Sequence, residues 1–475
     1  MNMKHLFLNF ACATVLITFG STTVSAQSTL KLDTTFAKKF DPISGPGIPV
    51  EGNGYGGWRS SNNSLRYKGN HPKSVYDLNW GNTSSTEAID SGRVPPILPA
   101  IELHVRDAVV TLGGDGNYYM TGSTGDNIWA YAKGIELWRS SDLMEWSYIG
   151  LVWDIDKEAD EWVREWRRYP NDESTQGVRA VWAPEIHYLP KHDNYYICFS
   201  MCPNGIGLLK SSTGNPEGPY VNCWAKKNEM VAKAIDPTLF EDEDGSVYMT
   251  FSGGGTIYKL KDDLSGFDGS GKKVTLSPAD TNPDHHASKC VNRGMGDFGH
   301  EGAILFKYKG RYYHGGADSY YGRYSSCIAV SDNIYGPYTM RHEPIPCDGG
   351  TNFFVDKNGD LWSSYFGNDT KSHFREKFSV VKAQVLDDGR IIPALEQPFV
   401  PENKKNAWKT KWDKLWKPLT VQTGIAVPQA NEAAEDPAAY YDLKGCKHDS
   451  LQKGIMVVSC ISKDKQRSSR KIQVR

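Results

Sequence analysis

Acidic residues occur at a fixed distance before a repeated aromatic position in this sequence of 475 residues. Counting back 12 residues from each of five aromatic anchors reaches Asp107, Pro184, Asp236, Glu301 and Gly350. Carboxyl groups that are buried close together have perturbed pKa values, so that one can hold a proton that its neighbour has lost. The shared spacing therefore predicts that Asp107, Asp236 and Glu301 form one site for acid–base chemistry.

The anchors belong to a repeated motif, in which one or two turn residues precede an aromatic residue and an alternating strand. They are Tyr119, Tyr196, Tyr248, Tyr313 and Trp362, and the spacings between them are 77, 52, 65 and 49 residues. A turn followed by alternating apolar residues is typical of a β-hairpin, and about 50 residues form one four-stranded propeller blade. We therefore predict an all-β fold, a five-bladed β-propeller over residues 99–400, with an open β-sandwich as the alternative.

A propeller would bring the acidic residues together, because the innermost strand of each blade begins near the central axis. Hydrolysis of a glycosidic bond needs a carboxylate base that activates water and a carboxylic acid that protonates the leaving oxygen. A third carboxylate can keep that acid protonated at neutral pH through repulsion between like charges. Three carboxyl groups around one cavity thus predict a glycosidase.

The segments that carry these residues have recognisable sequences: Val105–Val109, Trp182–Ile186, Ile235–Leu239 and His300–Ala303. Their sequences and their order resemble those of glycoside hydrolase family 43. The resemblance implies a five-bladed propeller and hydrolysis of arabinosides, xylosides or galactosides with inversion of configuration.

The resemblance also implies a role for each residue. Asp107 would be the general base, Glu301 the general acid, and Asp236 the residue that orients the substrate and modulates the pKa of the acid. Trp182 and Glu185 would bind substrate by lining the floor of the pocket. We expect an ionised Asp236 to raise the pKa of Glu301.

Two positions differ from the family pattern. Ala108 stands where the family usually has a proline after the base. The family commonly carries a Gly-His pair in the fifth blade, often linked to a central calcium ion, whereas this chain has Gly349-Gly350-Thr351-Asn352. We therefore predict no metal site and no required cofactor. Because the family pattern is linked to calcium, this prediction should be tested with calcium.

The sequence leaves the substrate open. We expect an α-L-arabinofuranosidase or a β-xylosidase, with a galactosidase or galactofuranosidase of the same fold as the alternative. A noncatalytic carbohydrate-binding propeller is a second alternative, although a lectin would gain nothing from three desolvated carboxylates. A fructosidase of a related fold would need an early Asn-Asp-Pro-Asn motif, which the chain lacks.

The N-terminal end predicts export. In residues 1–26, Lys4 and His5 precede an apolar run that is too short to span a membrane, and Val24-Ser25-Ala26 resembles a signal-peptide cleavage site. We therefore expect a signal peptide and a periplasmic, cell-surface or extracellular protein. Residues 27–98 are rich in Gly, Ser and Asn and should form an extension that wraps around the propeller.

The C-terminal end predicts two smaller parts. In residues 401–439, Trp408, Trp412 and Trp416 share one face of a short helix, which should dock on the propeller and lead into a linker. Residues 440–475 alternate between apolar and polar residues and end in a basic stretch. They resemble small C-terminal sorting modules of type IX secretion. We expect a small β tail there.

Composition narrows the possible partners. The formal net charge is −2, from 54 basic and 56 acidic residues, so nothing favours nucleic acid. We expect the protein to bind an oligo- or polysaccharide and no nucleic acid. We also expect it to be a monomer without a membrane span. Cys198 and Cys202 lack a second pair of ligands at zinc-finger spacing, which favours buried thiols in a strand.

Overall fold

The computed structural model describes two compact units, residues 1–418 and 419–475. In the first unit it describes residues 94–101, 105–124, 132–165, 180–201, 205–277, 298–320, 323–367 and 377–418. In the second unit it describes residues 419–421, 439–442, 447–448, 454–461 and 467–474. The expected signal peptide, most of the expected N-terminal extension and most of the expected linker lie outside the described residues.

Five four-stranded antiparallel sheets make up the first unit, and each follows chain order. Blade 1 contains β1 (Arg106–Leu112), β2 (Tyr118–Ser123), β3 (Gly134–Ser140) and β4 (Ser147–Asp154). Blade 2 contains β5 (Val181–Leu189), β6 (Asn194–Met201), β7 (Ile206–Ser211) and β8 (Tyr220–Asn222). Blade 3 contains β9 (Thr238–Glu241), β10 (Val247–Thr250), β11 (Thr256–Lys259) and β12 (Lys272–Lys273). Blade 4 contains β13 (Glu301–Tyr308), β14 (Arg311–Tyr320), β15 (Arg323–Ser331) and β16 (Thr339–His342). Blade 5 contains β17 (Phe353–Val355), β18 (Leu361–Tyr365), β19 (Ser379–Val385) and β20 (Ile391–Pro393).

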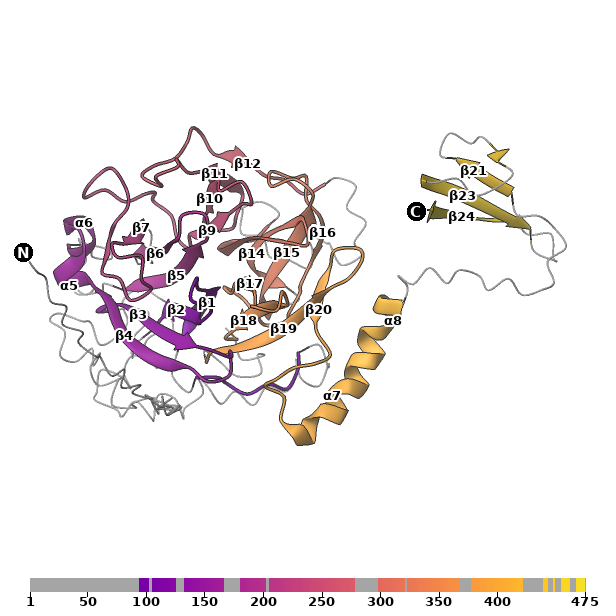
Figure 1. Ribbon diagram of the computed structural model, residues 1–475, viewed down its shortest axis with the longest axis horizontal. Coiled ribbons are helices and arrows are strands. Elements are labelled where there is room, and N and C mark those ends of the chain that lie inside the picture. Colours follow the sequence, from indigo (N-terminus) through magenta and orange to yellow (C-terminus); the bar gives the residue numbers. More distant parts are fainter. Residues whose placement is uncertain are drawn as a thin grey trace, which may run out of the picture. The chain divides into compact units, whose positions relative to one another are not determined.

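The sheets close into a ring, which confirms the predicted five-bladed β-propeller and excludes the open sandwich (Figure 1). Val110 N in blade 1 donates to Asn352 Oδ1 at 3.1 Å, and Asn352 Nδ2 donates to Val110 O at 3.0 Å. These two bonds join the first blade to the last. A closed ring also leaves each sheet edge short and protected.

The repeated aromatic pairs fill the spaces between blades, because successive strand residues point to opposite faces. Tyr118 contacts Phe354 of blade 5 edge-on, with ring centroids 6.4 Å apart, whereas Tyr119 contacts Tyr195 of blade 2 at 5.6 Å. All five anchors are buried. The motif seen in the sequence is thus the packing unit of the ring.

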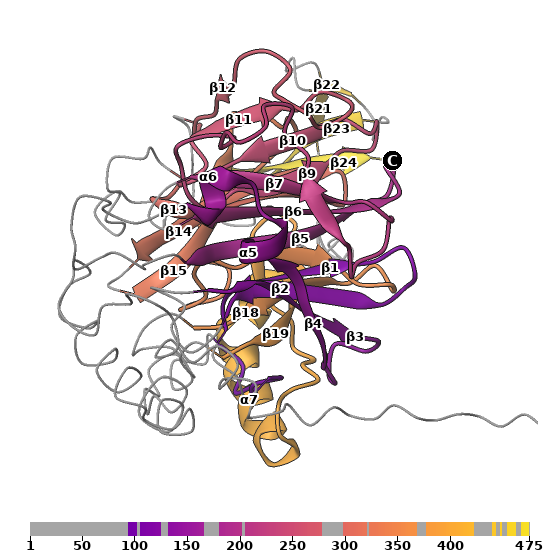
Figure 2. The ribbon, with the colours of Figure 1, turned by 90° about the vertical axis from the view of Figure 1, so that its left-hand side faces the viewer.

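Segments outside the strands also pack on the propeller. Val94, Ile97 and Ile101 are buried in the same apolar cluster as Phe378 and Phe399, so the described end of the N-terminal extension contacts blade 5. The short helices α5 (Ile155–Glu158) and α6 (Glu161–Arg164) bury Ile155 and Val163 against blades 1 and 2, on the side seen in Figure 2.

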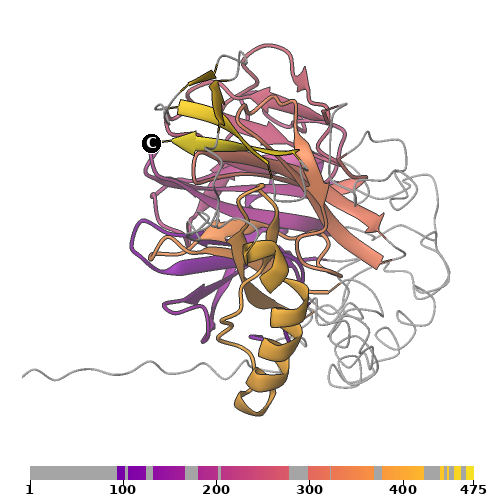
Figure 3. The same cartoon turned by 90° about the vertical axis from the view of Figure 1, so that its right-hand side faces the viewer.

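The predicted tryptophan-bearing helix is α7 (Glu402–Leu415), followed by α8 (Lys417–Val421) (Figure 3). Trp408 Nε1 donates to Leu395 O at 2.8 Å, and Trp412 Nε1 donates to Pro393 O at 2.9 Å. Both tryptophans are buried. The first two tryptophans therefore dock the helix on blade 5, as expected, and are not exposed for sugar stacking.

The second unit contains one antiparallel sheet, in the order β22-β21-β23-β24. Its strands are β21 (Ala439–Asp442), β22 (Lys447–His448), β23 (Gly454–Ile461) and β24 (Arg467–Val474). The small β tail expected for residues 440–475 is therefore this sheet. Among the described helices, none is long and apolar enough to cross a membrane.

Candidate active site

A left-handed residue lies within three residues of the start of every innermost strand: Asp107 (φ 51°), Ala183 (φ 43°), Asp236 (φ 51°), Gly302 (φ 61°) and Gly350 (φ 74°). For a residue other than glycine this conformation costs about 1–2 kcal/mol. Pairing between the first two strands of blades 1, 2 and 4 also shifts register nearby. The repeated irregularity redirects the side chains at these strand starts, which is where the sequence places its acidic residues.

The three predicted catalytic residues lie in one cluster. The charges of both Glu301 and Asp107 act on Asp236, and the backbone N–H of Gly302, next to Glu301, donates to Asp236 Oδ2 at 2.9 Å. Blades 1, 3 and 4 each supply one carboxyl group. Blades 1 and 4 are not neighbours in the ring, so Asp107 and Glu301 come from separate parts of it (Figure 1).

Asp107 makes contacts of the kind that a carboxylate anion makes. Ser123 Oγ donates to Asp107 Oδ2 at 2.9 Å, and Arg106 Nε lies 4.0 Å from the same oxygen. At Gly350 in blade 5, an added Cβ would lie 2.8 Å from Asp107 Oδ1. Glycine at that position therefore leaves the predicted base the space that it occupies.

Asp236 has one backbone donor and several anionic neighbours. Burial raises its pKa well above the usual range, and the negative charges of Glu301 and Asp107 raise it further. The Gly302 N–H bond favours the ionised form but does not offset these effects. In the free protein Asp236 is therefore the carboxyl group of the cluster that readily takes a proton.

Glu301 has the opposite balance. Burial raises the pKa of this carboxyl group, but contacts with His300 and Tyr324 outweigh burial and lower it. Tyr324 OH donates to Glu301 Oε1 at 2.6 Å, and His300 Nε2 lies 3.5 Å from the same oxygen. This direction is the reverse of the raised pKa that the sequence predicted for Glu301, because that expectation considered Asp236 alone.

A model of glycosyl hydrolases family 43 matches residues 98–384, which include blades 1 to 4 and most of blade 5. The chain belongs to glycoside hydrolase family 43.

Curated proteins are similar to this family 43 chain over parts of its length. The β-D-galactofuranosidase xynD of Aspergillus niger is 27% identical over 186 residues, which are 35% of this chain and 48% of that protein. A putative β-xylosidase of Xylanibacter ruminicola is 27% identical over 216 residues, 44% of this chain and 35% of that protein. The extracellular exo-α-(1→5)-L-arabinofuranosidase ArbA of Cellvibrio japonicus is 25% identical over 282 residues, 55% of this chain and 69% of that protein. The chain thus spans about half the length of the first protein and about a third of the second.

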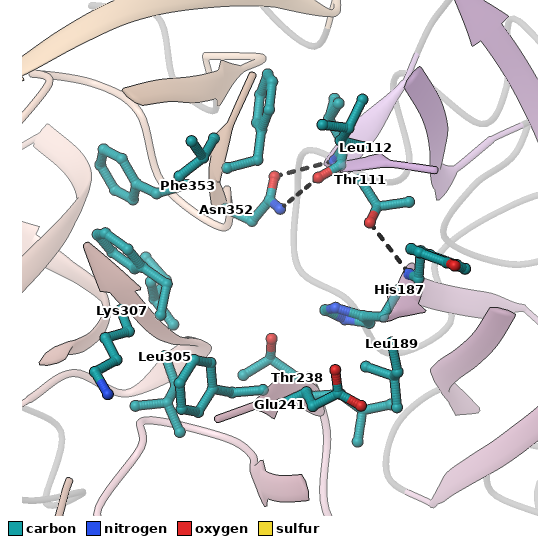
Figure 4. A pocket seen from close by; sticks show the side chains of 18 of the residues that line it. Thr111, Leu112, His187, Leu189, Thr238, Glu241, Leu305, Lys307, Asn352 and Phe353 are labelled. Atoms are coloured by element: carbon teal, nitrogen blue, oxygen red, sulfur yellow. Dashed lines mark hydrogen bonds between the residues drawn. The ribbon is translucent and has the colours of Figure 1, made fainter. Parts of the chain in front are cut away.

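A cavity of about 310 Å³ continues along the axis of the family 43 propeller (Figure 4). Residues on or directly before the same innermost strands line it, including Thr111, His187, Thr238, Leu305 and Asn352. Asn352 belongs to the fifth-blade segment that lacks the family's histidine, and its amide is engaged by Val110. Asn352 therefore joins blades 1 and 5 at this end of the cavity.

The two predicted substrate-binding residues lie on β5, and they differ in environment. Trp182 is half-buried near the start of the strand, before the register shift. Glu185 is buried and contacts His187 Nε2 through Oε2 at 2.9 Å, and its charge contributes to the raised pKa of Asp236. Glu185 therefore lies beside the carboxyl cluster and is already hydrogen-bonded within its own strand.

Glu185, His187 and Cys198 are the one group in the described part of the chain whose donor atoms could hold a metal, all within 4.8 Å of one another. The Cys198 thiol donates to Pro237 O at 3.0 Å, and Glu185 bonds His187. Burial raises the pKa of Cys198 well above its usual value, which disfavours the thiolate that metals bind. The group fits a hydrogen-bonded link between blades 2 and 3 better than a cation site.

Sequence reasoning missed two residues that contact Glu301. His300 directly precedes Glu301 in a segment already singled out, so its proximity could have been inferred from the sequence. Tyr324 comes from β15, and no spacing in the sequence connects it with Glu301.

Proposed function

We propose that this protein is a glycoside hydrolase that inverts anomeric configuration. The proposal rests above all on the convergence of three carboxyl groups from blades 1, 3 and 4 beside the axis. Blades that are not neighbours supply Asp107 and Glu301, which suits the separation of roughly 6.5–9.5 Å that an inverting pair needs to admit water.

In the proposed reaction, Asp107 removes a proton from a water molecule as the water oxygen forms a bond to the anomeric carbon. Glu301 delivers its proton to the glycosidic oxygen as the bond from that oxygen to the anomeric carbon breaks. The water attacks opposite the departing group, so the configuration inverts. Trp182 and Glu185 border the space in which the sugar lies.

Glu301 must carry a proton at the moment of bond cleavage, although its pKa is lowered in the free protein. Glu301 and Asp236 titrate as a pair, so the proton that Asp236 holds is available to the pair as a whole. Entry of a neutral sugar displaces water from Glu301, and loss of water favours the uncharged acid. Asp236 thereby modulates the acid and, as an acceptor, orients a sugar hydroxyl.

The substrate class follows from the relatives by analogy. Relatives named arabinofuranosidase and β-xylosidase support hydrolysis of α-L-arabinofuranosides or β-xylosides in polysaccharides or their side chains. The relative named galactofuranosidase supports the alternative substrate. The ordered contacts of the three carboxyl groups favour an enzyme over a noncatalytic sugar-binding propeller.

The proposed enzyme works as an exported monomer without a required metal or cofactor. Its N-terminal signal sequence and the extracellular Cellvibrio relative support export. The separate four-stranded sheet of the second unit, together with its sequence, supports a type IX-like sorting role for residues 440–475. Fusion of residues 419–475 to a reporter in a type IX-competent host tests that role, and failure of the fusion to reach the surface would contradict it.

A panel of aryl α-L-arabinofuranosides, β-xylosides and β-galactofuranosides tests the activity. We expect turnover on one of the first two sugars, and proton NMR should show the first-formed sugar with inverted configuration. A retained product would exclude the inverting mechanism. Sugar binding without turnover on the panel or on matching polysaccharides would favour the noncatalytic alternative.

A further inference from the structure

Behind Glu301 lies a row of side chains with alternating charge, all supplied by blade 4 or the residue that precedes it. His300 places its imidazole between two carboxylates, with Nε2 3.5 Å from Glu301 Oε1 and Nδ1 3.6 Å from Asp318 Oδ1. The His300 side chain is 11% exposed, and that of Asp318 is fully buried.

Arg341 completes the row on the far side of Asp318. Its Nη2 lies 3.4 Å from Asp318 Oδ2 and donates to Phe298 O at 3.3 Å. A buried carboxylate is stable only with such partners. Because Arg341 belongs to β16 and Asp318 to β14, strand pairing within the blade fixes the anchor behind His300.

Tyr324 completes the surroundings of His300. Its ring meets the imidazole edge-on at 5.8 Å, and its hydroxyl donates to the same Glu301 oxygen that His300 approaches. The titratable groups that face His300 from the described strands are therefore Glu301 on β13, Asp318 on β14 and Tyr324 on β15, with Arg341 on β16 behind Asp318. Burial raises the pKa of Tyr324 well above its usual value, so it stays a donor.

Both imidazole nitrogens of His300 face carboxylate oxygens, and an imidazole can donate from both nitrogens only when it is protonated. Burial alone would lower the pKa of His300, but its contacts with Asp318 and Glu301 outweigh burial and raise the pKa to about 9. At neutral pH the His300–Glu301 pair therefore holds one proton.

We propose that His300, anchored by Asp318 and Arg341, is a positioning residue for Glu301 that fixes its Oε1 and leaves Oε2 for the glycosidic oxygen. The inference rests on the proposed role of Glu301 as the general acid. The pair holds one proton that exchanges through solvent: the N–H bond at His300 Nε2 breaks as water accepts the proton, and water protonates Glu301 at Oε2. That O–H bond breaks in turn as the proton moves to the glycosidic oxygen. Solvent returns a proton to the pair after turnover.

This arrangement has a defined effect on the pH–rate profile. The basic limb reports loss of the proton on which the acid depends. Because His300 and Glu301 share that proton, the limb should lie near the raised pKa of His300, about 9, and not near that of a lone glutamate.

A comparison of leaving groups separates positioning from a structural role. We expect His300→Asn to lower kcat by about 10- to 100-fold on an aryl glycoside with a methoxyphenyl leaving group, which needs protonation. With a dinitrophenyl leaving group, which departs without an acid, the loss should be less than about threefold. The basic limb should also move down by more than about one pH unit.

Three controls accompany the experiment. His192→Asn removes an imidazole that pairs with Glu241 at 2.6 Å, outside the carboxyl cluster, and should leave both readouts unchanged. His300→Gln provides a second variant if the first unfolds, as thermal melting will show. NMR titration of His300 in the wild-type protein measures its pKa without any substitution, and we expect about 9.

An equal loss on both leaving groups, an unmoved basic limb, or a measured pKa of His300 below about 7 would overturn the inference. Glu301→Gln provides the reference for the proposed function itself. If Glu301→Gln keeps wild-type turnover, the role of Glu301 is wrong. If that variant is inactive while His300→Asn fails to distinguish the leaving groups, only the positioning role of His300 is wrong.

Discussion

Blades 3 and 4 each bring one carboxyl group to the axis, yet they give it opposite surroundings. Asp236 in blade 3 has one backbone donor and several anionic neighbours, and its pKa is raised. Glu301 in blade 4 has a phenol donor and an imidazolium beside it, and its pKa is lowered. Equivalent places in a repeated fold therefore do not have equivalent chemistry.

The difference arises in the strands behind the site. Blade 4 is built from longer strands than blade 3. Its β14 and β15 place Asp318 beside His300 and Tyr324 beside Glu301, and β16 places Arg341 beside Asp318. In blade 3, the backbone N–H of Asp236 donates to Ser200 Oγ of blade 2. This bond fixes the main chain of Asp236 but does not stabilise a negative charge on its carboxyl group. The fold itself thus decides which carboxyl group takes a proton first.

The largest expected effect comes from removing the acid or the base. Glu301→Gln and Asp107→Asn should each lower kcat by about 10²- to 10⁴-fold, the usual contribution of a general acid or base. Circular dichroism should show an unchanged fold. Turnover near the wild-type level in either variant, with contaminating enzyme excluded, would contradict the assignment. The difference between blades 3 and 4 would then have no catalytic meaning.

Asp236→Asn should lower turnover at neutral pH by about 10- to 100-fold and shift the basic limb of the pH–rate profile down by about one to two units. The sign follows from the pair: an anion at Asp236 makes its partner hold a proton more tightly, and the amide removes that anion. The acidic limb, which reports the base Asp107, should stay nearly fixed. A basic limb that stays in place or moves upward would mean that Asp236 only orients the substrate.

Gly350→Ala extends the comparison to blade 5. The new methyl group would lie 2.8 Å from Asp107 Oδ1, at a residue with φ of 74°. We expect a loss of about 1–2 kcal/mol in unfolding free energy and a severalfold fall in kcat as the base is displaced, with the basic limb unchanged because Glu301 is untouched. A basic limb that moves would show that blade 5 also acts on the acid.

Chelation should have the smallest effect. Dialysis against EDTA should leave turnover within error of the untreated enzyme. The possible ligands found in the described residues, Glu185, His187 and Cys198, already form hydrogen bonds within the protein, and burial raises the pKa of the Cys198 thiol. If activity were lost and calcium restored it, a cation at the axis would be part of the electrostatic difference between the blades.

Much of this protein could be predicted from local order along the chain. The aromatic anchors recur because each fills the space between two blades, so their spacing predicts the number of blades. Asp107, Asp236 and Glu301 could be found because strand starts at one register must converge in a ring. The spacing of Trp408 and Trp412 on one helical face predicted docking on the propeller, and the structure showed that blade 5 is the docking site.

The charge state of the site could not be predicted in the same way, and only the tertiary structure decided it. The pKa of Glu301 depends on groups within a few ångströms. Strand pairing, not any sequence spacing, brings Tyr324 to Glu301 and brings Asp318 to His300. The sequence by itself determined which residues meet at the axis, because repeat spacing is a property of the chain. Proton affinity depends on burial and on the distances between charges, and those quantities exist only once the blades have packed.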